Sequence, residues 1–152
     1  MTVTRVSWRI NAPRAQVYRA LLDVDAVARW MVPTGMSSHV HAFEPREGGA
    51  FRVSLTYDAP TGTGKTTAQT DTYHGRFVTL VPNEQVVEVV EFETTDPALG
   101  GEMTITISLA DADGGTEIVA VHDGLPPGLS AADNELGWRS SLAKLAALVA
   151  AS

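Results

Sequence analysis

The chain has 152 residues, of which 44% are hydrophobic, with a net charge of −7 and no cysteine. This length and composition predict one domain with its own core, residues 1–152, and exclude a disordered chain. The acidic charge argues against nucleic-acid and anionic membrane partners. The lack of cysteine excludes disulfides and thiolate metal sites, and it fits a cytoplasmic location.

The first third of the chain predicts a strand followed by two short helices. Residues 2–10, TVTRVSWRI, alternate as a strand and lack the continuous apolar run of a signal peptide. Pro13 suits the first turn of a helix over 13–23. Residues 25–32 predict a second short helix, which Pro33 and Gly35 end.

Six further strands are predicted in series after these helices. They cover residues 39–45, 50–58, 67–80, 85–94, 102–110 and 116–122. The sequence DADGG at 111–115 predicts a tight hairpin between the last two. Because the strands follow one another without intervening helices, they predict an antiparallel meander rather than βαβ units.

The C-terminal segment predicts a long helix. Ser130 and Asp133 form an S-x-x-D start signature, and Trp138, Leu142 and Val149 recur at helical spacing beyond it. Its apolar end, LAALVAA at 145–151, is too short to span a bilayer. We therefore expect an amphipathic helix packed against a curved sheet.

The segment APTGTGKT at 59–66 is one residue away from a phosphate-binding P-loop. A P-loop needs a buried strand before it and a helix after it. Here the preceding residues 51–57 alternate as a half-solvated strand, and the following TTAQTDTYHGRFVTL is rich in β-branched residues. We interpret the segment as a hairpin loop and expect no ATP binding through Lys65.

Five segments together resemble the START-like superfamily, also called SRPBCC or helix-grip proteins, in the branch of activator of heat-shock protein 90 ATPase homologues. They are APRAQVYRALLDVDAVARWMVP, EPREGGAFRV, YHGRFVTLVPNEQVVEVVEF, GEMTITISLADADGGTEIVAVHDGLP and LGWRSSLAKLAALV. The resemblance implies an α+β helix-grip fold: a seven-stranded antiparallel sheet curved around the long C-terminal helix, enclosing a cavity for hydrophobic molecules.

Nine residues are candidates to line this cavity, chosen as aromatic, methionine or histidine side chains. They are Trp30, His41, Phe51, Tyr73, Phe77, Phe92, Met103, His122 and Trp138. His122 shares its parity with Ile118 and Ala120 and is expected on the helix-facing side, as a core histidine or as a cavity acid or base. The strand face of His41 is left open.

The acidic residues of strand 85–94 pose an open question, because that strand is apolar on both faces. Glu88 shares a face with Val90 and Phe92, whereas Glu91 and Glu93 share the other. One of the three could point into the cavity, where desolvation would raise its pKa. His39 and His41 lie two residues apart, but no supporting ligand spacing accompanies them, so we expect no metal and no cofactor.

These observations favour a protein that binds a small hydrophobic molecule. A cyclase or hydrolase of the same fold, using a cavity histidine or carboxylate, is the first alternative, and no catalytic residue is assigned. A protein-interaction module is the second, although the co-chaperone of this family uses an additional N-terminal domain, and this chain begins directly at its first strand. A homodimer is left open.

Overall fold

A computed structural model describes residues 2–58 and 70–150 of the chain. The elements are β1 (Thr2–Ile10), α1 (Arg14–Leu21), α2 (Val24–Trp30), β2 (Met36–Phe43), β3 (Ala50–Tyr57), β4 (Thr70–Val81), β5 (Gln85–Phe92), β6 (Met103–Ala112), β7 (Gly115–Leu125) and α3 (Ala131–Ala150). Their order confirms the predicted sequence of a strand, two helices, six strands and a long helix.

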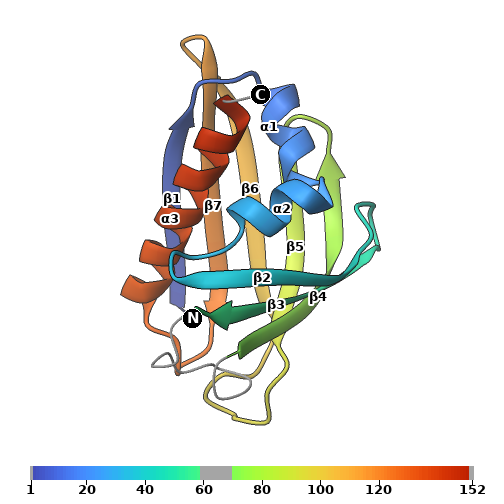
Figure 1. The fold of residues 1–152 in the computed structure, drawn as a ribbon, viewed down its shortest axis with the longest axis vertical. Coiled ribbons are helices and arrows are strands. Elements are labelled where there is room, and N and C mark those ends of the chain that lie inside the picture. Colours follow the sequence, from blue (N-terminus) through green and yellow to red (C-terminus); the bar gives the residue numbers. More distant parts are fainter. Residues whose placement is uncertain (1, 59–69, 151–152) are drawn as a thin grey trace.

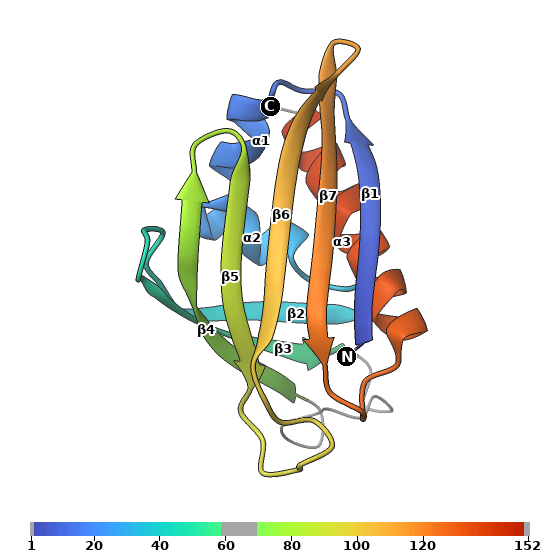
Figure 2. The same ribbon diagram turned by 180° about the vertical axis from the view of Figure 1, so that it is seen from behind.

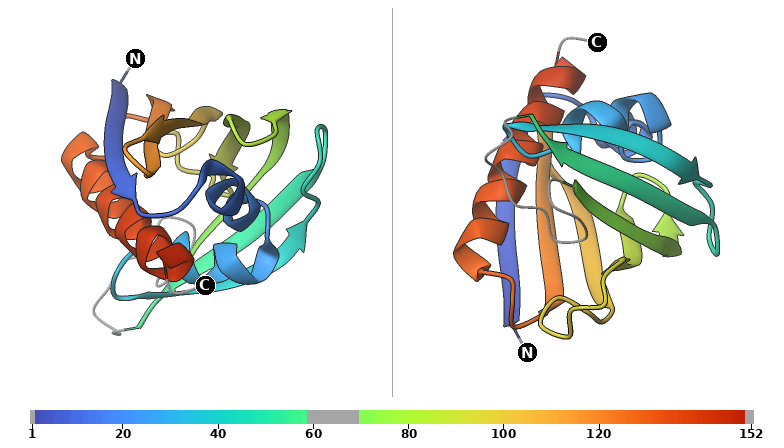
Figure 3. Two further views of the ribbon diagram at one scale, coloured as in Figure 1. Left: turned by 90° about the horizontal axis from the view of Figure 1, so that it is seen from above. Right: turned by 60° about the horizontal axis from the view of Figure 1, so that its bottom comes forward.

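The strands form one seven-stranded antiparallel sheet in the order β1-β7-β6-β5-β4-β3-β2. The sheet curls strongly, so that β2 and β3 cross in front of the other strands while all three helices lie on the concave side (Figure 1). Figure 2 shows the opposite face of β4–β7 and β1 uncovered by helices, and Figure 3 shows the sheet wrapping towards α3. This architecture confirms the helix-grip fold.

Gly75 marks a position in the sheet at which a side chain cannot be accommodated. Gly75 of β4 lies opposite Val90 of β5 and Phe51 of β3. A Cβ atom at this position would lie 2.0 Å from the carbonyl oxygen of Val89 and 2.8 Å from the Phe51 ring. The missing side chain therefore lets the Phe51 ring close over β4, as a glycine in a strand allows where another group approaches closely.

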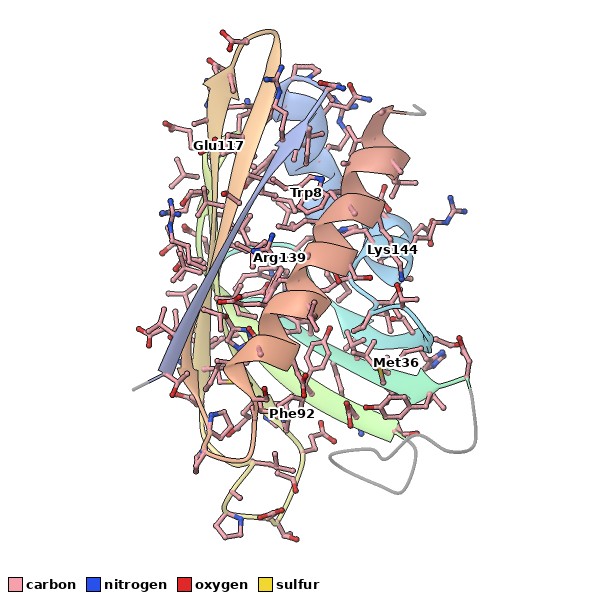
Figure 4. All side chains as sticks on the ribbon, turned by 90° about the vertical axis from the view of Figure 1, so that its left-hand side faces the viewer. Trp8, Met36, Phe92, Glu117, Arg139 and Lys144 are labelled. Atoms are coloured by element: carbon pink, nitrogen blue, oxygen red, sulfur yellow. The ribbon has the colours of Figure 1, made fainter. Side chains whose placement is uncertain are left out.

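The helix α3 begins and packs as its sequence predicts. Ser130 Oγ accepts a hydrogen bond from the Asp133 backbone N–H at 3.2 Å. The buried residues of the helix are Trp138, Ser141, Leu142, Leu145 and Val149. On its other side, Lys144 donates to the Val32 carbonyl oxygen at 2.6 Å, which ties α3 to the segment after α2 (Figure 4). None of the described helices combines the length and hydrophobicity needed to cross a membrane.

Some predicted boundaries differ from the observed ones. Pro13 is the residue before α1 rather than its first helical residue. Strand β2 begins at Met36 rather than at residue 39, because Gly35 turns the chain at a φ of 89° and Met36 already pairs with Tyr57. The hairpin at 111–115 is present, with Asp113 at a φ of 37°. The loop at 59–66, with Lys65, lies outside the described residues.

Candidate functional site

One row of inward-facing side chains crosses five neighbouring strands of the concave face. The row runs from Phe77 on β4 through Glu88, Ile105 and His122 to Thr4 on β1. All five side chains are buried. The sheet register thus places an acid and a histidine on the same interior surface, separated by the one strand that carries Ile105.

An aromatic cluster lies on the β2–β4 side of this row. Phe77 stacks edge-on against Phe43 at 5.6 Å between ring centroids and packs against Phe51 at 5.2 Å. Tyr73 meets the Phe51 ring at 6.4 Å. Three residues that we predicted to line the cavity, Phe51, Tyr73 and Phe77, are therefore brought together on adjoining strands.

A hydrogen-bonded polar network lies on the other side of the row, beneath α3. The Trp138 indole N–H donates to His122 Nδ1 at 3.1 Å, and the Asn134 amide nitrogen lies 3.3 Å from the same atom. Thr4 in turn donates from its hydroxyl group to the Asn134 side-chain oxygen. The network connects β1, β7 and the first two turns of α3 through three buried side chains and the partly buried Asn134.

This network fixes the protonation of His122. Because Nδ1 accepts from Trp138, the proton of the neutral ring resides on Nε2, which lies 3.1 Å from the sulfur of Met103. Burial lowers the pKa of His122 to about 4. The side chain is therefore a neutral, fully engaged core histidine, with side-chain partners on both ring nitrogens, and it is a poor acid or base near neutral pH.

Glu88 is the interior acid that remains without a partner. Its side chain is 6% exposed, and its carboxyl group makes no hydrogen bond or ion pair with any described residue. Desolvation raises its pKa from the ordinary value of 4.5 to about 7. This answers the question left open by the sequence: of Glu88, Glu91 and Glu93, it is Glu88 that faces the interior.

The carboxyl oxygens of Glu88 keep some accessible surface. Ser38 Oγ is the one buried side-chain polar atom of the described residues that lacks both a partner and accessible surface. The carboxyl oxygens of Glu88 also lack a described partner, but unlike Ser38 Oγ they keep accessible surface. Tyr73 likewise keeps part of its surface accessible, although burial, with the nearby charge of Glu88, raises its pKa above the usual range.

The other two acids of this region form an ion-pair network on the outer face of the same strands. Arg52 binds Glu93 through two nitrogens, at 2.7 and 2.9 Å. His74 lies between the acids, with one ring nitrogen 3.1 Å from Glu93 and the other 3.0 Å from Glu91. The hydrogen bond from Arg52 is the main reason that the pKa of Glu93 falls to about 2.

Eight of the nine predicted site residues lie wholly or partly inside the molecule. Phe92 is partly buried at the end of β5, and Trp30 is buried on α2 and donates its indole N–H to the Ala20 carbonyl oxygen at 3.2 Å. The others are Phe51, Tyr73, Phe77, Met103, His122 and Trp138, described above. Whether they line a ligand site stays a prediction.

His41 does not belong to this interior group. It is exposed, its Nε2 lies 2.7 Å from Ser54 Oγ, and its ring meets that of His39 edge-on at 4.6 Å between centroids. The residue borders an open hollow of about 510 Å³ outside the core, lined by Leu22, Asp23, Val24, Val40, His41, Ala42, Phe43 and Pro45. Within residues 2–58 and 70–150, no three His, Asp or Glu side chains are placed to share a metal ion.

Sequence reasoning missed two polar members of the interior, Asn134 and Ser38. Asn134 precedes Trp138 by four residues, so the apolar stripe of the helix extended by one turn would have placed it on the buried face. No local signal identifies Ser38, because its strand alternates polar and apolar residues irregularly around His39 and His41.

Comparisons with known proteins agree with this architecture. Residues 11–150 match the family model described as activator of Hsp90 ATPase homolog 1-like protein. A crystal structure from Chromobacterium violaceum is similar over 97% of this chain and 96% of that one, with 34% identity and a TM-score of 0.86. No curated protein matches the sequence.

More distant structures share the fold alone. A protein from Rhodobacter sphaeroides has 23% identity and a TM-score of 0.77 over 97% of this chain and 93% of that one. DynU16, from the dynemicin biosynthetic locus, has 21% identity and a TM-score of 0.66 over 97% of this chain and 46% of that one. The chain belongs to the family of activator of Hsp90 ATPase homolog 1-like proteins, within the START-like superfamily of helix-grip domains.

Proposed function

We propose that the chain binds a small, largely apolar molecule between the concave face of the sheet and α3. The observation that carries the proposal is Glu88, a buried carboxyl group without a described protein partner whose oxygens keep accessible surface. Buried polar groups in folded proteins are normally hydrogen-bonded. A bound molecule that meets this carboxyl group would supply the missing partner.

The side chains around Glu88 suit an apolar occupant. Phe77 and Ile105 flank it on the neighbouring strands, and Met103 lies on the next inward position of β6. Aromatic and methionine side chains adapt to varied apolar shapes, and most small-molecule sites combine such a lining with a few polar groups. Glu88 and Tyr73 are those polar groups here.

A dye-binding experiment tests this proposal. An apolar fluorescent dye should bind saturably, at one molecule per chain, and Ile105→Trp should abolish binding, because Ile105 lies directly opposite Glu88 on the concave face. The matched control is Thr104→Trp on the outer face of β6, which should bind as the wild type does. Circular dichroism should show both variants folded. Equal binding by both variants, or no saturable binding by the wild type, would contradict the proposal.

An enzyme of the same fold is the second candidate, and the pKa of about 7 at Glu88 is the observation that favours it. A group that titrates near neutral pH can both accept and donate a proton. Native mass spectrometry of freshly purified protein would identify a bound molecule. Incubating that molecule with the protein then separates the two functions, since an unchanged mass and chromatographic retention time support binding, whereas a change in either that Glu88→Gln abolishes supports catalysis.

The protein-interaction alternative has less support. The exposed large apolar residues in the described part of the chain, Val3, Val24, Val78 and Leu136, come from four different elements. These residues therefore do not mark any one of the four elements as an apolar docking face. The cytoplasmic location stays a prediction.

A further inference from the structure

Among the described residues, the buried side chains that can carry a full charge near neutral pH are acids. Asp71 and Glu88 are buried acids, whereas no lysine or arginine among the described residues is buried. Lys144, which is half-buried, already donates to the Val32 carbonyl oxygen. An acid bound in the interior would therefore find no described basic side chain as a buried counter-charge.

His122 cannot take the place of a basic side chain. Its Nδ1 accepts from Trp138, and its Nε2 faces the Met103 sulfur, so neither nitrogen is free for a bound anion. Protonation would require Trp138 to lose its acceptor, and burial holds the pKa of the ring at about 4. The histidine is neutral wherever the protein works near neutral pH.

Glu88, by contrast, offers acceptor capacity. A carboxyl group has two oxygens and about four lone-pair sites, and none of them is used by a described residue. The neighbouring Tyr73 hydroxyl group makes only a long contact, 3.7 Å, to the sulfur of Met31. A second carboxylate placed here would meet like charge in a low-dielectric interior, whereas a donor would be attracted.

We infer that the interior site selects apolar molecules that carry a hydrogen-bond donor, with an aliphatic amine preferred, and that it disfavours carboxylic acids. This inference rests on the proposed function, because it names the chemical class of the molecule bound there. The amine or hydroxyl group contacts Glu88, and the apolar body lies against Phe77, Ile105 and Met103. The site is thus distinguished from one built for fatty acids.

Three ligands of equal chain length test the selection: decylamine, decanol and decanoate, each displacing the apolar dye from the wild-type protein at moderate salt and neutral pH. We expect decylamine to bind at least about tenfold more tightly than decanoate, a difference of about 1.4 kcal/mol, with decanol between them. Glu88→Gln should weaken decylamine about tenfold and leave decanol nearly unchanged.

The matched control is Glu91→Gln, which removes one acidic group from the outer face of the same strand. Because the chain carries a net charge of −7, general attraction of amines to the protein would fall equally in both variants. An equal loss in both variants, or decanoate binding as tightly as decylamine, overturns the inference while leaving the binding function intact. If none of the three ligands displaces the dye and the dye itself does not bind saturably, the proposed function fails, and the inference fails with it.

Discussion

The two sides of the sheet at β5 carry the same residue type in opposite states. Glu88, on the concave face, is 6% exposed and without a described partner, and its pKa rises to about 7. Glu93, just beyond the end of β5 on the convex side, is paired with Arg52 and His74, and its pKa falls to about 2. The difference arises from which side of the sheet each residue faces, since alternate positions of a strand point to opposite sides.

The histidines of the two faces differ in the same way. His122 on the inner face is locked by neutral partners from α3 and β6, whereas His74 on the outer face lies between two carboxylates. On the outer face, the charged side chains of Arg52, Glu91 and Glu93 are paired with one another or with His74. On the inner face, His122 has hydrogen-bond partners, whereas Glu88 has none among the described residues. A bound molecule that supplies the missing partner of a buried acceptor gains specificity from that contact.

The largest expected effect concerns the inner face beneath α3. Trp138→Ala should lower the free energy of unfolding by about 3–5 kcal/mol, because it removes a buried indole ring and leaves a cavity. Trp138→Phe should cost less, about 1–3 kcal/mol, since the ring remains and mainly the donor to His122 is lost. Urea unfolding measures both.

The control for these variants is Arg139→Ala on the solvent-exposed side of the same helix. It should change stability by no more than about 0.5 kcal/mol. If Trp138→Ala cost as little as this control, the indole ring would not be part of the packed core, and the inner network would not organise this side of the sheet.

A smaller effect, specific to pH, is expected at Glu88. Its folded pKa of about 7 exceeds the ordinary 4.5, so between these values the folded protein keeps a proton that the unfolded chain has lost. The contribution of Glu88 to the free energy of unfolding is therefore fully present below about pH 4. It falls by ~3 kcal/mol as the pH rises to about 8. Glu88→Gln should remove this decline and be the more stable protein at about pH 8.

Urea unfolding across this pH range checks the sign as well as the size of the effect. Glu91→Gln, on the outer face, should keep the wild-type slope between about pH 4 and pH 8. Parallel pH profiles for wild type and Glu88→Gln would mean that Glu88 is solvated and that the two faces of β5 do not differ as described.

The smallest effect is expected on the outer face. The pKa of Glu93 lies below the ordinary value, so its stabilisation is present above about pH 4.5 and is lost as pH falls towards about 2. Because the pair with Arg52 is partly exposed and screened, Glu93→Gln should cost at most about 1 kcal/mol at neutral pH. High salt should reduce this cost, whereas it should leave the effect of Glu88→Gln nearly unchanged. A salt-insensitive loss at Glu93 would contradict a surface ion pair.

Local patterns in the sequence were sufficient for the elements and for much of the core. The Ser130 cap and the stripe through Trp138, Leu142 and Val149 are short-range features, so the buried face of α3 could be predicted from spacing alone. The order of consecutive strands likewise predicted the antiparallel meander. Strand ends were less certain, as at Met36, because pairing with a distant strand extends β2 beyond its local signal.

Only the tertiary structure decided which polar residues face the interior. The run VVEVVEFE is apolar on both faces, so its pattern could not choose between Glu88 and Glu91, and the choice depends on the register of β5 with Phe77 and Ile105. The partners of His122 come from Trp138 and Asn134, which are 16 and 12 residues away in sequence, and from Met103, 19 residues away. A sequence determines periodicity along one element, whereas a site is made where several elements meet, and that meeting is fixed by the packing of the whole chain.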